Sequence, residues 1–134
     1  MMQRTRNIHL LGERHDVPDL LNALDIATSS SSGEGLPNAI GEAMATGLPC
    51  VVTDAGDSAV LVGDTGLVVP KKDPQALCNA WRRLLDEGAG LRKAMGGRAR
   101  RRIVEHYSLA AMVGGYEALY KRLMTGRESR RTSE

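Results

Sequence analysis

Residues 26–53 carry the pattern that most restricts how this chain can fold. A short apolar run, Ile26–Ser29, leads into a loop rich in serine and glycine, and a second apolar run, Pro49–Thr53, follows a stretch with helical periodicity. Pro37 suits the first turn of that helix, because its missing N–H would have no partner there. A strand, a loop, a helix and a second strand are typical of a parallel sheet covered by helices. We therefore expect an α/β fold with a mostly parallel sheet.

The rest of the chain continues this alternation and then becomes helical. The other elements expected before residue 70 are a strand at Ile8–Leu11, a short helix at Pro18–Leu24, a helix or turn at Asp57–Gly63 and a strand at Gly66–Val69. Helices are predicted after it over Asp73–Glu87, over Leu91–Glu105 and from Ser108 onward. Trp81 is spaced as a core residue. The residues through which the last helix should pack are Met112, Tyr116, Leu119, Tyr120 and Leu123.

Composition favours a single globular domain without a specialised partner. The chain has 134 residues, of which 42% are hydrophobic and 25% charged, as in ordinary folded domains. A net charge of +2 indicates no particular ligand. Cys50 and Cys78 fall in apolar contexts, so we interpret them as reduced core residues of a cytoplasmic protein. No apolar run approaches the ~20 residues of a membrane span.

Two glutamates flank the start of the predicted helix at residue 37. Glu34 lies in the loop before it, and Glu42 lies on the helix, opposite its apolar stripe. A carboxylate accepts two hydrogen bonds at once and so suits a pair of neighbouring hydroxyls. The N–H groups of Gly35 and Leu36, together with the helix N-terminus, favour a phosphate between the two. The segment therefore suggests a nucleotide-sugar site, although two glutamates at this spacing are also compatible with ordinary surface charges.

Several further segments, in order along the chain, carry a family resemblance. The matching pieces are Leu10–Gly12, Val17–Leu21, Ser32–Pro37, Glu42–Val51, Gly63–Pro70 and Asp73–Leu77. Together they resemble the C-terminal half of family 4 glycosyltransferases, which are retaining enzymes of the GT-B architecture. Two departures stand out: Leu36 replaces a frequent phenylalanine, and Asp54–Ser58 replaces a turn that often carries two glycines.

The resemblance implies a partial Rossmann-like domain over residues 1–125. Residues 126–134 are polar and terminal, so we expect a disordered tail there. It implies transfer of a hexosyl unit from a nucleoside diphosphate sugar to a sugar or lipid-linked acceptor, without a further cofactor or a metal ion. Glu34 would be catalytic, and Arg14 and His15 would flank the nucleobase. The residues assigned to donor binding are Ser32, Glu34, Gly35, Leu36, Pro37, Asn38, Glu42, Arg14 and Val17.

The family's N-terminal domain and a basic pair for the diphosphate have no counterpart in this sequence, so we expect a fragment that is inactive alone. A peripheral position at the inner membrane face is compatible with this assignment. Sheet edges left without their usual neighbours would favour a homo-oligomer.

Other functions remain alternatives. A non-catalytic binding module, an inert fragment or a sugar-nucleotide 2-epimerase would share the architecture. The basic run Arg98–Arg102 lacks interleaved aromatic residues, so we interpret it as a solvated helix face and expect no nucleic-acid partner. His9, His15 and His106 do not have the spacing of metal ligands.

Overall fold

The computed structural model describes the backbone of residues 7–131 and the side chains of residues 7–125. Three parallel strands form one sheet in the order β1 (Ala27–Ser29), β2 (Cys50–Thr53) and β3 (Leu67–Val69). The register pairs Ala27 with Cys50 and Val52 with Val68. The predicted parallel α/β fold is therefore confirmed.

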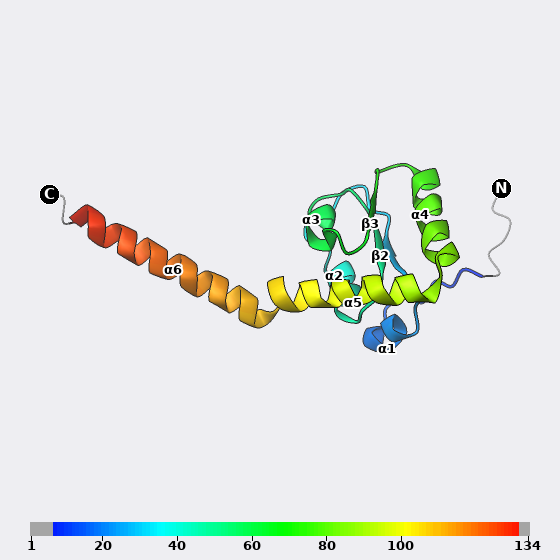
Figure 1. The fold of residues 1–134 in the computed structure, drawn as a ribbon, viewed down its shortest axis with the longest axis horizontal. Coiled ribbons are helices and arrows are strands. Elements are labelled where there is room, and N and C mark those ends of the chain that lie inside the picture. The colour runs from blue at the N-terminus through cyan, green and yellow to red at the C-terminus, as the bar shows by residue number, and fades with distance from the viewer. Residues whose placement is uncertain (1–6, 132–134) are drawn as a thin grey trace.

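Six helices accompany this sheet within the described residues (Figure 1). They are α1 (Val17–Asn22), α2 (Asn38–Ala45), α3 (Ser58–Val62), α4 (Pro74–Asp86), α5 (Gly88–His106) and α6 (Leu109–Arg131). The start of α4 is as predicted, since the Asp73 side chain accepts a 2.8 Å hydrogen bond from the Ala76 N–H.

The two faces of β2 belong to two separate apolar clusters. Successive strand side chains point to opposite faces, and Val52 packs with Ile40, Met44 and other residues of α2 and α3. Val51 packs instead with Leu84 of α4 and with other residues of the second cluster. Helix α5 contributes to both clusters and so holds the two layers together.

The predicted strand at Ile8–Leu11 is wrong. These residues are not in a strand, and Ile8 and Leu10 are 65% and 97% exposed. A strand needs a neighbour for its backbone N–H and C=O groups, and in the described part of the chain no strand pairs with this segment.

Two predicted packing arrangements are also wrong. Helix α6 extends away from the domain in Figure 1, and the five residues through which it should pack are 37–61% exposed. An amphipathic stripe shows that a helix can bury one face, but no described element lies along most of α6. Trp81 is 40% exposed rather than buried, and its indole N–H donates to the Thr28 hydroxyl at 2.9 Å.

The end of α6 enters the range for which the sequence predicts disorder. Its backbone is helical as far as Arg131, in a stretch without proline whose arginines and glutamate are good helix formers. Residues 132–134 lie outside the described residues. None of the helices in the described residues combines the length and the apolar character that a membrane span requires.

Candidate donor-binding site

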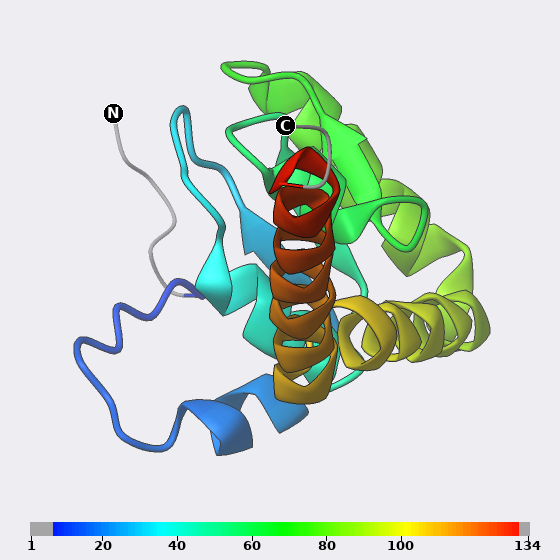
Figure 2. The ribbon, with the colours of Figure 1, turned by 90° about the vertical axis from the view of Figure 1, so that its left-hand side faces the viewer.

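The loop over residues 30–37 connects the carboxyl end of β1 to the start of α2. Figure 2 shows this loop standing out from the body of the domain. In open parallel α/β sheets, ligands bind at the carboxyl edge of the strands. The loop that carries Glu34 therefore lies where a ligand of this fold is expected.

Hydrogen bonds fix the middle of this loop. The Ser31 hydroxyl donates to Oε1 of Glu34 at 2.5 Å. The hydroxyl of Thr53, at the end of β2, donates to the Ser31 carbonyl oxygen, also at 2.5 Å. The Asp57 N–H donates to the Gly35 carbonyl oxygen at 3.2 Å. The loop is thus attached both to the central strand and to the turn that follows it.

Gly56 allows that turn to approach the loop closely. Its φ is +52°, in the left-handed region, and a Cβ there would stand 2.7 Å from the Glu34 carbonyl carbon. Only glycine satisfies both conditions without strain. The turn over Asp54–Ser58, which departs from the family pattern, therefore keeps a glycine at the position where the backbone requires one.

A groove of about 540 Å³ opens beside α2. The loop and α2 line one side with Leu36, Pro37, Asn38, Gly41, Glu42 and Ala45. The other side comes from Leu61, Ile103, His106, Tyr107 and Met112. Glu42 is exposed, so its carboxylate is accessible from the groove without the removal of packed side chains. The arrangement offers an apolar surface with a carboxylate, an amide and an imidazole at its edges.

The groove brings together only part of the predicted site. Leu36, Pro37, Asn38 and Glu42 line it, whereas Ser32, Glu34 and Gly35 are exposed in the adjoining loop. The second side of the groove was not predicted from sequence. Its residues come from α3, α5 and α6, far along the chain from Glu42, and no local spacing joins them to the loop.

Arg14 and Val17 lie outside this groove. Arg14 forms two hydrogen bonds with the carboxylate of Asp16, at 2.7 and 2.5 Å. This contact lowers the pKa of Asp16 and raises that of Arg14. Val17 is the first residue of α1 and is 37% exposed, and His15 is exposed. The structure places these three residues on the segment before α1 and at its start.

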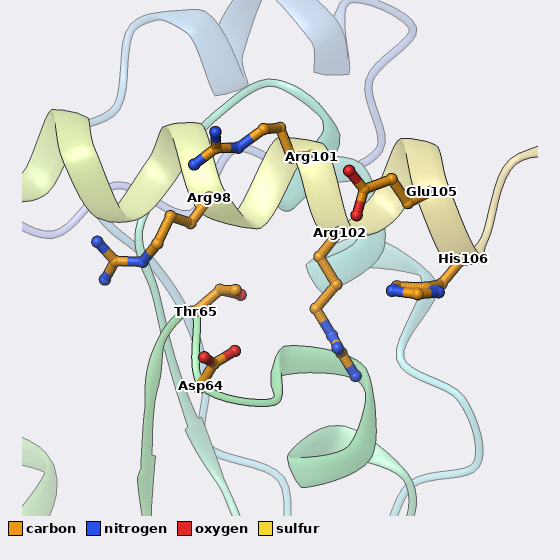
Figure 3. Close-up of a pocket in the computed structure, with 7 residues that line it drawn as sticks. All are labelled: Asp64, Thr65, Arg98, Arg101, Arg102, Glu105 and His106. Carbon is orange, nitrogen blue, oxygen red and sulfur yellow. The ribbon is translucent and has the colours of Figure 1, made fainter.

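A second groove, of about 340 Å³, lies between α5 and the turn before β3 (Figure 3). It is lined by Asp64, Thr65, Arg98, Arg101, Arg102, Glu105 and His106. Arg102 extends toward α3 and donates to the carbonyl oxygens of Val60 and Leu61 at 2.7 and 2.9 Å. Arg100 donates to the Ala45 carbonyl oxygen at 3.0 Å. Two arginines of the basic run therefore hold helices together, while Arg98 and Arg101 are exposed.

In the described residues, His, Cys, Asp and Glu side chains do not gather in groups of three or more that could hold a metal ion. Burial raises the pKa of the Cys50 thiol to about 12, so this thiol stays protonated near neutral pH.

Two curated proteins are similar to this chain over most of its length. A galactosyltransferase of Escherichia coli, UDP-Gal:alpha-D-GlcNAc-diphosphoundecaprenol alpha-1,3-galactosyltransferase, is 32% identical over 121 residues, covering 89% of this chain and 31% of that protein. The N-acetyl-alpha-D-glucosaminyl L-malate synthase of Bacillus anthracis is 30% identical over 128 residues, covering 90% of this chain and 33% of that protein. The chain thus spans about a third of the length of these curated relatives.

Solved structures show the same fold. Sucrose-phosphate synthase from Thermosynechococcus elongatus superposes with a TM-score of 0.70 at 28% identity, covering 80% of this chain and 27% of that one. The C-terminal domain of a glycosyl transferase group 1 family protein from Francisella tularensis gives a TM-score of 0.66 at 24% identity, covering 76% of this chain and 53% of that one.

Most of the chain also matches one known protein family. Residues 2–87, which include β1, β2, β3 and the loop that carries Glu34, match the family described as glycosyl transferases group 1. The fold is part of the C-terminal half of the GT-B architecture, as the structural neighbours show. The chain therefore belongs to the glycosyl transferases group 1 family.

Proposed function

We propose that this chain forms the nucleotide-sugar-binding part of a retaining glycosyltransferase. The enzyme would transfer a hexosyl unit from a nucleoside diphosphate sugar to an acceptor hydroxyl. The observation that carries the proposal is the pair of glutamates around the start of α2. The Glu34 carboxylate is held in the loop by Ser31, and Glu42 lines the groove beside the helix.

Each group has a distinct role in the proposal. Glu34 accepts hydrogen bonds from hydroxyls of the transferred sugar, and Glu42 accepts them from the ribose. The N–H groups of Gly35 and Leu36 and the positive end of α2 bind the diphosphate between them. Because the leaving diphosphate gains negative charge during transfer, these donors stabilise the transition state more than the ground state. No metal ion is needed for this electrostatic role.

The acceptor side of the reaction comes from the rest of the enzyme. The E. coli relative acts, by its name, on a sugar carried on diphosphoundecaprenol. A sugar or lipid-linked acceptor, reached from the cytoplasmic face of a membrane, is therefore the acceptor class that we propose. The part of each relative that this chain does not match would supply the acceptor groups.

Calorimetric titration of the chain with UDP, UDP-galactose, GDP and GDP-mannose tests the proposal. We expect one nucleotide and its sugar conjugate to bind, and Glu42→Gln to weaken both by about tenfold or more, as for a lost charge-assisted hydrogen bond. Glu117→Gln on exposed α6 is the matched control and should leave both affinities unchanged. Failure of all four compounds to bind, or equal effects of the two variants, contradicts the proposal.

A further inference from the structure

We infer that Ser31 is a positioning residue for the Glu34 carboxylate, and that Thr53 holds Ser31 in place. The inference rests on the proposed function, in which Glu34 contacts the transferred sugar. The inference gives a role to Ser31, one serine of the run Ser29–Ser32. From the sequence, Ser32 was the serine of this run expected to line the sugar pocket. Neither Ser31 nor Thr53 was among the predicted site residues.

The sheet places Thr53 beside Ser31. Ser29 pairs with Val52 across the parallel ladder, so the loop that follows Ser29 leaves the sheet beside Thr53, the last residue of β2. Thr53 is 5% exposed, and its hydroxyl donates to the Ser31 carbonyl oxygen. Because the Thr53 hydroxyl is buried and donates to this carbonyl oxygen, it fixes the backbone of Ser31 against the end of β2.

Ser31 then fixes Glu34 through its own side chain. Its hydroxyl donates to Oε1 of Glu34, while the Ser29 hydroxyl lies 3.4 Å from the Ser31 oxygen. The Glu34 side chain is otherwise exposed and has three flexible torsions, so a glutamate without this bond would sample many rotamers. The contact keeps one carboxylate oxygen in place and leaves Oε2 open to accept from a ligand hydroxyl.

Ser30 lacks these features. It is exposed, and within the described residues its side chain forms no hydrogen bond to another protein group. It directly precedes Ser31 in the same loop and has the same side chain. Ser30→Ala is therefore a matched control for Ser31→Ala.

The first measurement follows Glu34 without any ligand. In the chain labelled with 13C and 15N, three-bond couplings report how far the Glu34 side chain averages among rotamers. We expect a single dominant rotamer in the wild type and in Ser31→Thr, and averaging in Ser31→Ala and Thr53→Val. Unchanged couplings in Ser31→Ala would overturn the inference. Melting curves show whether each variant is folded.

The second measurement compares a nucleotide with its sugar conjugate, using UDP and UDP-galactose or GDP and GDP-mannose, whichever pair binds. We expect Ser31→Ala to raise the Kd of the sugar nucleotide roughly three- to tenfold, from the lost rotamer order of one glutamate. The Kd of the nucleotide alone should stay within about twofold of the wild-type value, and both Kd values of Ser30→Ala should do the same. Ser31→Thr should restore the wild-type values.

The outcomes separate the two levels of inference. An equal loss for nucleotide and sugar nucleotide in Ser31→Ala means that the serine only supports the loop, which overturns the positioning role. If neither pair binds the wild type, the proposed function fails, and the couplings alone then decide whether Ser31 orders Glu34.

Discussion

Gly96 of α5 lies directly against the backbone carbonyl group of Gly47, two residues beyond the end of α2. A Cβ on Gly96 would stand 2.6 Å from the Gly47 carbonyl carbon, closer than side chains pack in proteins. Gly97, the next residue, has no neighbour within 4 Å of the same position. Since α2 carries Glu42 and begins at the Glu34 loop, this approach of α5 helps to determine where the site lies.

The first prediction compares these adjacent glycines. Gly96→Ala should destabilise the fold by about 1–3 kcal/mol, the usual cost of overpacking a tight contact. Gly97→Ala should stabilise the fold by about 0.5–1 kcal/mol. Alanine restricts the backbone of the unfolded chain more than glycine does, and the added Cβ at this position would meet no neighbouring atom. Urea unfolding of the wild type and the two variants measures these free energies of unfolding. Similar free energies of unfolding for the two variants would contradict the close contact.

The second prediction concerns the turn that supports the Glu34 loop. Gly56→Ala introduces both an unfavourable φ and a clash with the Glu34 carbonyl group. Gly88→Ala introduces the unfavourable φ alone, since Gly88 has a φ of +84° and nothing within 4 Å. We expect Gly88→Ala to cost about 1–2 kcal/mol and Gly56→Ala to cost more, with weaker binding of a sugar nucleotide. Equal costs would mean that the turn can move away from the loop.

Local pattern was sufficient to predict the centre of this fold. Pro37, the apolar positions of α2 and the runs on either side of it are neighbours in sequence, so their periodicity alone indicates strand, helix and strand. The same holds for Asp73 at the start of α4, where a side chain bonds a backbone group three residues on. Such contacts depend on few residues outside the element itself.

The failures come from contacts that sequence does not specify. The pattern at Ile8–Leu11 suits a strand, but a strand forms only where a partner lies beside it. The groove beside Glu42 is completed by Ile103, His106 and Tyr107, which reach it through the path of α5. The bond from Thr53 to Ser31 likewise depends on the register of β1 and β2. Each of these contacts can be predicted only when the order and register of the strands and the paths of the helices are known.

The third prediction concerns turnover. In a full-length enzyme that contains this domain, Glu34→Ala should lower kcat strongly, whereas Glu42→Ala should mainly raise the KM for the sugar nucleotide. The reason is that Glu34 reaches the transferred sugar and Glu42 the ribose in the proposed site. The isolated chain, assayed with the same donors and acceptors, should show no transfer. Wild-type kinetics in both variants, or turnover of ~1 per second by the isolated chain, would contradict the assignment.

The fourth prediction follows from the buried thiol of Cys50, whose pKa is raised to about 12 by burial. In the unfolded chain a cysteine has a pKa of about 8.5. The stability that comes from the neutral buried thiol is therefore complete below this pH and is lost as the pH rises toward 12. Between pH 9 and 10.5, the wild type should lose about 1.4 kcal/mol per pH unit more than Cys50→Ala. Urea unfolding of the wild type and of Cys50→Ala at each pH provides the measurement, and equal pH dependence of the two proteins would contradict the prediction.

The last prediction concerns assembly through the free edge of the sheet. Strand β1 pairs with β2 on one side only, and in residues 7–131 no other strand covers its second edge. The Ala27 N–H bonds inward to the Pro49 carbonyl oxygen, so in the alternating pattern of a strand the Thr28 N–H points outward. An exposed row of such groups favours pairing with a second chain. We therefore expect a homo-oligomer at micromolar concentration in light scattering.

Three variants identify the surface that forms this oligomer. Thr28→Pro removes the outward N–H and should give a monomer, because proline blocks pairing at a strand edge. Thr28→Val keeps that N–H but loses the hydrogen bond to Trp81, and it should remain oligomeric. Tyr120→Glu places a charge on the exposed apolar face of α6 and should also leave the oligomer intact. A monomer produced by Tyr120→Glu alone would place the contact on α6, and a monomeric wild type would show that the prediction is wrong.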